Sequence, residues 1–398
     1  MRGLEAAARQ VFDKHLLADS RRPLAVGLSG GGDSLALTLL ADAWARDIGR
    51  ELVILTVDHG LQPQSAAWTA ACADVAGRLD RPFRALAWEG EKPSTGLPAA
   101  ARRARHRLLA EAAREAGARV ILLGHTADDL AEAAVMRAGG STTPDPRPWS
   151  PSPGWPDGRG LFLLRPLLGA RRRELRDWLQ DAGKTWIEDP ANADPRYARS
   201  RARLAGPDTT GPIAPEAPLS LADLATECAG VISIPRGALA AGAPRDVRRF
   251  VGLAAVCCGG GERLPASARV DRAAQALAGS TPFVATLAGA RIEASDGSVR
   301  IFREAGEAGR GGLTPLTPPG VWDGRFEIAS GPVVRRLSGL ALHLSPSDKK
   351  RLREIPPSAR GSLPAIVDAQ GGVRLGPLES LVGDRFRAAA GLVQREPA

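Results

Sequence analysis

One glycine-rich stretch restricts the fold of this 398-residue chain more than any other segment: Leu-Ser-Gly-Gly-Gly-Asp-Ser at residues 28–34. A strand-like apolar run precedes it at Leu24–Leu28, and a helix-like run follows it at Leu35–Leu40. Glycines let the backbone turn tightly and approach a ligand closely. The first N–H groups of the helix then point at that ligand, with the positive end of the helix dipole behind them. This order predicts an anion-binding site, whose candidate residues are Ser29, Gly30, Gly31, Gly32, Asp33 and Ser34.

The loop differs from two well-known nucleotide-binding loops. No Gly-Lys-Ser/Thr follows it, as a Walker A loop requires, and it lacks the Gly-x-Gly-x-x-Gly spacing of a dinucleotide-binding fold. The structural alternative is a glycine-rich turn that Asp33 and Ser34 cap.

Strand-like and helix-like runs alternate from Pro23 to about Asp181. The strand-like runs are Leu24–Leu28, Leu52–Val57, Phe83–Trp88, Arg119–Gly124 and Leu161–Leu164. The helix-like runs are Ser34–Arg46, Ser65–Leu79, Leu97–Ala116, Ala127–Ala138 and Arg171–Ala182. This alternation predicts an α/β fold with a parallel, Rossmann-like sheet and helices on both faces. Ligands of such sheets bind beyond the carboxyl ends of the strands, so the polar stretches 29–34, 58–61 and 125–129 are expected to converge.

We expect a catalytic domain at residues 1–206, a linker at 207–218 and a smaller C-terminal region at 219–398. The Pro- and Gly-rich stretch Ser141–Gly160 is predicted to be a loop without structure of its own. The C-terminal region is predicted to be helical and then α+β, and the Pro/Gly-rich stretch Ala305–Gly320 divides it into two subdomains. Its predicted elements are the helices Val247–Val256 and Ala266–Leu277 and the strands Phe283–Leu287, Ala290–Ala294 and Val299–Arg303, with a hairpin at Asp296-Gly297.

Composition adds limits on partners and location. The net charge of +9 and the sequence pI of about 10.2 favour a polyanionic partner such as nucleic acid. Most of the positive charge is arginine, which a GC-rich genome also produces, so charge alone does not decide the matter. The four cysteines form no Cys-x-x-Cys pair, so zinc-ribbon and iron–sulfur spacings are absent. No signal peptide and no membrane-spanning run are found, and a cytoplasmic location is expected.

Two predicted elements carry further candidate binding residues. Asp58 and His59 stand at the end of the second predicted strand, where the structural alternative is a polar strand end that caps the next helix. Arg102 and Arg105 are three residues apart on a predicted helix, so they share a face and both can meet a phosphate. The structural alternative for this pair is a solvated basic helix face.

A second strand–turn–helix segment, residues 123–132, carries acids. Asp129 and Glu132 share a helix face by their spacing. Carboxylates in a first helical turn complement the helix dipole, but they also suit magnesium, which prefers carboxylate oxygens. Beside a nucleotide loop the metal interpretation is favoured. Further along, an acid-rich turn with Glu188 and Asp189 precedes a basic helix, which suits either substrate binding or an exposed, capped helix.

Together these segments resemble PP-loop enzymes, which split ATP into AMP and pyrophosphate, and among them the tRNA(Ile)-lysidine synthase family. The family pattern runs Ser-Gly-Gly-x-Asp-Ser, Val-Asp-His-Gly-Leu, Ala-Arg-x-x-Arg-Tyr, Leu-Gly-His-His-x-Asp-Asp-x-x-Glu and Glu-Asp-x-x-Asn. Versions of all five occur in order between Pro23 and Arg203. His106, Thr126 and Ser200 stand where the family usually has tyrosine, histidine and asparagine. A weaker match covers Phe302-Arg303-Glu304 and Trp322-Asp323-Gly324-Arg325-Phe326.

The resemblance implies an adenine nucleotide alpha hydrolase-like fold and a reaction that uses ATP and Mg²⁺. L-lysine is joined to C2 of the wobble cytidine of tRNA(Ile) with anticodon CAU, through an adenylated tRNA. It implies ATP binding by residues 29–34, Asp58 and His59, catalysis by Asp33, Arg105, Asp129 and Glu132, and metal binding by Asp33 and Asp129. The implied tRNA-binding residues are Arg102, Arg171, Arg172, Arg199, Arg201 and Arg203. Glu132, Glu188 or Asp189 is expected to bind or deprotonate the lysine ammonium, and a homodimer is one arrangement that the sequence allows.

The sequence disfavours three other functions. A tRNA thiolation enzyme that uses catalytic cysteines or an iron–sulfur cluster needs paired cysteines, whereas Cys72 is the sole cysteine of the predicted catalytic domain. A non-catalytic nucleotide- or tRNA-binding protein would not need Asp33, Asp129 and Glu132 together. A small-molecule amidating ligase would leave the basic helices unexplained.

Overall fold

The computed structural model describes residues 2–140, 146–189, 201–202, 217–306 and 313–398. The chain divides into two compact units: unit 1 is Met1–Glu216 together with Val393–Ala398, and unit 2 is Ala217–Leu392. The sequence assigns residues 393–398 to the C-terminal region, whereas their contacts are made with unit 1. Most of the predicted linker, residues 207–216, lies outside the described residues.

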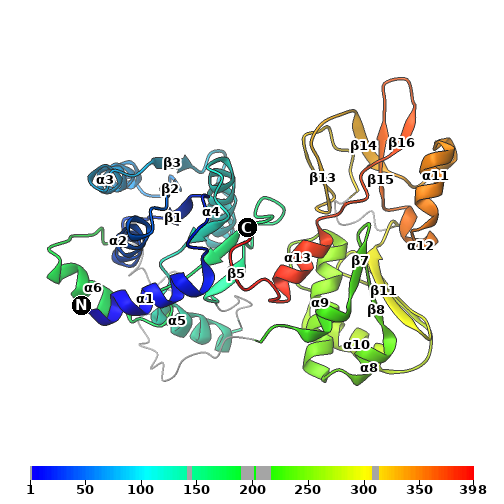
Figure 1. Ribbon diagram of the computed structural model, residues 1–398, viewed down its shortest axis with the longest axis horizontal. Helices are drawn as coiled ribbons and strands as arrows, with labels where there is room; N and C mark the ends of the chain where they lie inside the picture. The colour runs from blue at the N-terminus through cyan, green and yellow to red at the C-terminus, as the bar shows by residue number, and fades with distance from the viewer. Residues whose placement is uncertain (1, 141–145, 190–200, 203–216, 307–312) are drawn as a thin grey trace. The chain divides into compact units, whose positions relative to one another are not determined.

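Unit 1 is built on a six-stranded sheet of order β3-β2-β1-β4-β6-β5 (Figure 1). The strands are β1 (Leu24–Gly27), β2 (Leu52–Asp58), β3 (Phe83–Ala87), β4 (Val120–Leu122), β5 (Trp149–Pro151) and β6 (Phe162–Leu164). The first five in sheet order are parallel, as predicted, and β5 is antiparallel to β6. The prediction that Ser141–Gly160 lacks structure was therefore wrong for β5. This strand lies at the sheet edge, where a proline is tolerated because one side needs no ladder hydrogen bond.

Helices cover both faces of this sheet, which confirms the predicted layers. They are α1 (Arg2–His15), α2 (Gly32–Asp47), α3 (Ser65–Arg78), α4 (Leu97–Glu115), α5 (Ala127–Ala138) and α6 (Arg172–Asp181). Leu24 and Val26 of β1 belong to the core with α1, α2 and α6, whereas Ala25 belongs to the core with α4. A strand that is buried on both faces has a continuous apolar sequence, and β1 has such a sequence. Among the described residues, no helix has the length and apolar character needed to cross a membrane.

Unit 2 begins with a five-stranded sheet of order β7-β8-β11-β10-β9. Its elements are η2 (Ser220–Leu224), β7 (Thr226–Cys228), β8 (Val231–Pro235), α8 (Arg236–Ala241), α9 (Pro244–Gly259), α10 (Ser267–Ala278), β9 (Phe283–Leu287), β10 (Ala290–Ala294) and β11 (Ser298–Arg303). β10 and β11 pair antiparallel around Asp296-Gly297, so the predicted hairpin is confirmed. Phe250 and Val251 of α9 pack in the core of this sheet.

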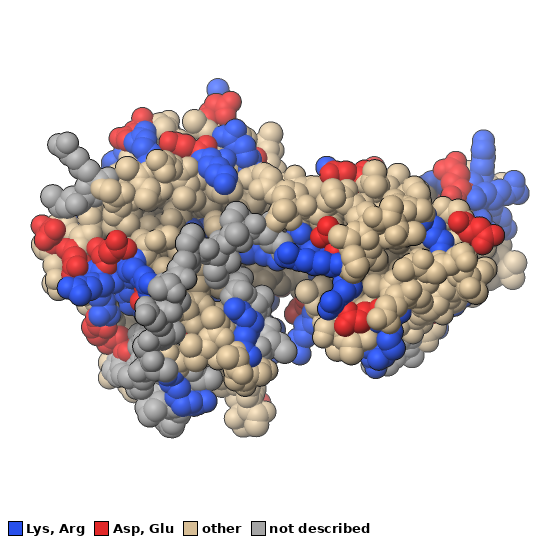
Figure 2. Space-filling model, turned by 90° about the horizontal axis from the view of Figure 1, so that it is seen from below, with Lys and Arg blue, Asp and Glu red and all other residues tan. Residues whose placement is uncertain are grey.

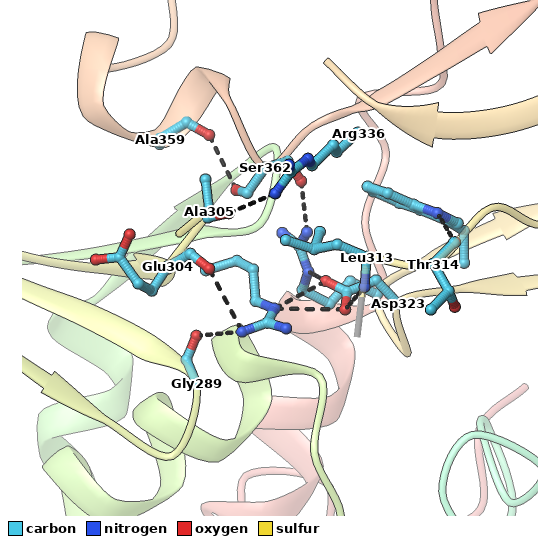
Figure 3. A network of polar contacts seen from close by, with 12 residues as sticks. Gly289, Glu304, Ala305, Leu313, Thr314, Asp323, Arg336, Ala359 and Ser362 are labelled. Carbon is cyan, nitrogen blue, oxygen red and sulfur yellow. Dashed lines mark hydrogen bonds and ion pairs between the residues drawn. The ribbon is translucent and has the colours of Figure 1, made fainter. Parts of the chain in front are cut away.

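The rest of unit 2 holds a hairpin and a three-stranded sheet, β14-β15-β16. Its elements are β12 (Gly320–Trp322), β13 (Phe326–Ile328), β14 (Val333–Arg336), η4 (Ala341–His343), α11 (Pro346–Arg353), α12 (Pro357–Arg360), β15 (Pro364–Val367), β16 (Val373–Leu375) and α13 (Val382–Ala389). A buried ion network joins this part to β11 (Figure 3). Asp323 Oδ2 lies 3.1 Å from Arg303 Nε and 2.8 Å from Arg325 Nε, and Arg325 also donates to the carbonyl of Ser362. Both segments that weakly matched the family pattern therefore meet in the core.

Candidate active site

The carboxyl ends of β1, β2 and β4 open into one cleft of about 660 Å³ in unit 1. That volume is typical of a small-molecule site. The cleft is lined by the glycine-rich loop after β1, by Asp58 and His59 after β2, and by His125 and Asp129 after β4. The three polar stretches come together because parallel strands end at the same edge of their sheet.

The glycine-rich loop is ordered by its own hydroxyl groups. Ser34 Oγ donates to the carbonyl of Gly31 at 2.9 Å and accepts the backbone N–H of Ser29 at 3.1 Å. A Cβ on Gly124, at the end of β4, would lie 2.8 Å from the carbonyl oxygen of Asp33. The second strand–turn–helix segment can therefore approach the loop this closely only because it has glycine there.

A short segment after α6 packs on the loop, and sequence reasoning did not predict this. Gly30 has a φ of +84°, and a Cβ there would lie 2.5 Å from Cδ1 of Ile187. The N–H of Ile187 donates to the carbonyl of Gly30 at 2.9 Å. Trp186 lies against Gly32 in the same way, with ring atoms 3.4 Å from the position of a Cβ. The apolar pair 186–187 directly before the acids at 188–189 was the available signal.

Arg172 lies among the predicted catalytic acids. Its Nε is 3.0 Å from Asp33 Oδ2, its Nη1 is 3.2 Å from Glu132 Oε1, and its Nη2 is 3.8 Å from Asp129 Oδ1. The sequence predicts a tRNA-phosphate contact for Arg172, but only 14% of its side chain is exposed. Arg172 is the first residue of α6, where its N–H donates to Asp128 Oδ2 at 2.7 Å, so the helix start directs it into the cluster.

The charges of this cluster are coupled. Burial raises the pKa of Asp33, and the nearby Arg172 opposes that rise. Burial would lower the pKa of Arg172, but Asp33, Asp129 and Glu132 together raise it. The guanidinium therefore keeps its charge, and it offsets part of the negative charge of the three carboxylates.

The acids fit a metal ion only with help from a ligand. Within the described ranges, no three His, Cys, Asp or Glu side chains are close enough to form a metal site. Asp33 and Asp129 nevertheless contact the same guanidinium, so their carboxylates lie near one point. Magnesium is commonly held by one or two carboxylates together with phosphate oxygens. The pair thus fits a magnesium ion that enters with a nucleotide.

Helix α4 adds a cationic wall to the cleft. Arg105 of α4 lines the cleft. Burial, and then the charge of Arg105, lowers the pKa of His59. Arg102 is half-buried on the same helix, and His106 is buried at 4% exposure. Arg105 thus acts on the imidazole of His59 in the cleft, and both arginines act on the imidazole of His106 on their own helix.

The remaining predicted residues are spread more widely. Arg171 begins the turn into α6, where its N–H donates to Glu174 Oε2 at 2.6 Å, and Arg201 is exposed. Arg199 and Arg203 lie outside the described residues. Glu188 and Asp189 both line the cleft, and Glu188 Oε1 is 2.9 Å from Arg176 Nη2.

Sequence reasoning missed Arg165, the first residue after β6. Its Nε donates to His125 Nδ1 at 3.1 Å. The rule that located the other polar stretches, a polar residue at the carboxyl end of a parallel strand, would also have identified Arg165.

Comparisons with known proteins identify the family of this chain. Residues 4–205 match a family model described as a PP-loop domain. The tRNA(Ile)-lysidine synthase of Caulobacter vibrioides is 48% identical over 410 aligned positions, which cover 98% of each chain. Those of Hyphomonas neptunium and Rhizobium meliloti are 36% and 35% identical, covering 71% and 79% of this chain and 82% and 74% of theirs. The chain therefore belongs to the tRNA(Ile)-lysidine synthase family of PP-loop enzymes.

Proposed function

We propose that this protein uses ATP and Mg²⁺ to ligate L-lysine to C2 of the wobble cytidine of tRNA(Ile) with anticodon CAU. The observation that carries the proposal is the single cleft, in a chain of this family, where a glycine-rich anion loop, two carboxylates facing one point and a cationic wall meet. We expect the reaction to take place in the cytoplasm with its tRNA.

In the first step, the O2 atom of the cytidine attacks the α-phosphorus of ATP and the bond to pyrophosphate breaks. The N–H groups and hydroxyls of residues 29–34 hold the departing pyrophosphate, because a helix start and its loop bind anions. Asp33 and Asp129 would hold Mg²⁺, which would supply positive charge to offset that of the phosphates. Arg105, which lines the cleft, stabilises the α-phosphate.

In the second step, the lysine amine attacks C2, loses its proton and displaces AMP. Glu188 and Asp189 are our candidates to bind the lysine ammonium, because both line the cleft. Glu132 suits this role less well, since it is 2% exposed and its carboxylate contacts Arg172.

Exposed basic residues supply the expected contacts with tRNA phosphates, which provide much of the affinity in such complexes. In unit 1 Arg201 is exposed. In unit 2 α11 carries Lys349, Lys350, Arg351 and Arg353, all exposed, and Figure 2 shows basic side chains gathered at the end of unit 2 that holds this helix. The placement of Arg172 among the acids favours a role in charge balance of the site for that residue.

The test is incorporation of labelled lysine into a tRNA(Ile) transcript with anticodon CAU, in the presence of ATP and Mg²⁺. We expect Asp33→Asn to lower incorporation by about 100-fold or more, the scale for loss of a group that stabilises transition-state charge. Asp47→Asn is the matched control, because Asp47 is an exposed residue in the last turn of the same helix. A tRNA(Met) transcript with the same anticodon tests specificity.

Incorporation that requires ATP and is lost only in Asp33→Asn would support the proposal. Release of pyrophosphate that depends on tRNA, without incorporation of lysine, would retain the adenylation step and reassign the nucleophile. If the folded protein gives neither signal, the enzymatic proposal fails.

A further inference from the structure

Two neighbouring strands end in a pair of side chains that the proposed reaction has not yet used. His125 follows β4, and Arg165 directly follows β6. The two strands are parallel, with Leu122 opposite Leu164, so both side chains belong to the carboxyl edge of the sheet. His125 lines the cleft at 9% exposure, and Arg165 is buried at 5% exposure.

The guanidinium of Arg165 is fixed by hydrogen bonds on two sides. Its Nε–H donates to His125 Nδ1 over 3.1 Å. Its Nη1 donates to Ser150 Oγ at 3.0 Å, on β5, and to the carbonyl of Arg147 at 2.8 Å. These three hydrogen bonds hold the planar guanidinium in place. The one that ends on Nδ1 therefore leaves the ring of His125 little freedom to turn.

This contact determines where the imidazole proton resides. A guanidinium has donors and no acceptor. Burial, and then Arg102 and Arg105, lower the pKa of Arg165 to about 9, so it remains a cation near neutral pH. Nδ1 of His125 must therefore accept, and a neutral ring then carries its proton on Nε2. Arg102 and Arg105 lower the pKa of Arg165, and the carboxylate of Asp129 opposes that shift.

We propose that Arg165 is a positioning residue that holds His125 as the neutral Nε2–H tautomer, so that His125 donates a hydrogen bond to a phosphoryl oxygen of the nucleotide. The identity of that ligand rests on the proposed function, whereas the tautomer does not. A neutral donor in a fixed orientation stabilises the negative charge that builds on phosphoryl oxygens as pyrophosphate departs. The same arrangement excludes Nδ1 of His125 as the base that takes the lysine proton.

The tautomer can be measured without substrate. In protein labelled with ¹⁵N-histidine, a long-range ¹H–¹⁵N spectrum near neutral pH distinguishes protonated from unprotonated ring nitrogens. We expect His125, assigned by loss of its signals in His125→Gln, to show an unprotonated Nδ1 and a protonated Nε2. Arg165→Lys, which keeps a donor, should preserve this pattern, whereas Arg165→Met should give mixed tautomers. The signals of the other four histidines, His15, His59, His106 and His343, report whether each variant is folded.

The second arm measures pyrophosphate release that depends on tRNA. Arg165→Met should lower its kcat by about 100-fold, the effect of a misplaced group, with partial recovery in Arg165→Lys. A protonated Nδ1 in the wild-type protein, or an unchanged tautomer in folded Arg165→Met, overturns the proposal. If Arg165→Met does not fold, the spectra of the wild-type protein and of Arg165→Lys still show whether Nδ1 of His125 is unprotonated. The predicted tautomer in a protein that is inactive on tRNA would refute the proposed function and leave the positioning role intact.

Discussion

At the scale of single residues, the burial of His106 predicts that the protein loses stability in acid. His106 stands where the family pattern usually has tyrosine, it is 4% exposed, and its buried Nε2 has no hydrogen-bond partner among the residues that the structure describes. Burial, followed by the charges of Arg105 and Arg102, lowers the pKa of His106 well below 6.5 in the folded protein. Below pH ~6.5 the imidazole of His106 is therefore protonated in the unfolded chain but stays neutral in the folded chain.

We expect His106→Phe to remove this sensitivity. Above pH ~6.5 the imidazole is neutral in both states and contributes no pH dependence. As the pH falls below that value, the wild-type free energy of unfolding should drop by up to about 1.4 kcal/mol per pH unit more than that of the variant. Urea unfolding of the full chain at several pH values measures the difference, and equal slopes would show that His106 does not contribute.

Residue identity was easier to predict from sequence than residue surroundings. The loop residues 29–34 and the acids at 129 and 132 line or approach the cleft as expected. The sequence did not indicate that Arg172 turns into the acid cluster, because three consecutive arginines, 171–173, give no local sign of which one turns inward. That choice depends on where α6 starts relative to Asp128, a contact 44 residues away in the chain.

At the scale of elements, local patterns located strands and helices well. β9 and β10 have the predicted bounds, because each alternates buried and less buried residues around a tight turn. β5 was missed because a three-residue edge strand gains its stability from pairing with β6 rather than from its own sequence.

The buried ion network of Figure 3 leads to a prediction about the stability of unit 2. Asp323→Asn should remove the carboxylate that pairs with the guanidinium groups of Arg303 and Arg325, whose side chains are 2% and 1% exposed. We expect the free energy of unfolding of unit 2 to fall by about 3–5 kcal/mol, the cost of breaking a buried ion pair. Asp296→Asn is the control, because Asn-Gly also suits the exposed hairpin turn. Urea unfolding with equal midpoints for both variants would contradict a stabilising role.

At the scale of the whole molecule, the chain passes between the two units twice, because residues 393–398 return to unit 1. Glu396 is bound by the guanidinium of Arg50 through two hydrogen bonds, one of 2.8 Å, and both side chains are almost fully buried. The carbonyls of Val393 and Gln394 accept from Trp149 and His15 at 2.8 Å. No local pattern predicts a pair separated by 346 residues, so the sequence could not reveal this return.

We expect Glu396→Gln to destabilise unit 1 by about 3 kcal/mol, since Arg50 would remain buried without a countercharge. Glu379→Gln, at an exposed position in unit 2, is the matched control. Hydrogen exchange of α1 should speed up in the first variant alone. Unchanged protection of α1 would mean that residues 393–398 add little to the stability of unit 1.

The central claim is that the cleft of unit 1 joins lysine to a cytidine. Mass spectrometry of the nucleosides of a tRNA(Ile) transcript with anticodon CAU, after incubation with the protein, ATP, Mg²⁺ and L-lysine, tests it most directly. We expect the wobble cytidine to gain the mass of one lysine less one water. Omitting ATP or lysine should abolish this gain in mass. An unmodified cytidine, or a mass change that corresponds to exchange of oxygen for sulfur, would contradict it.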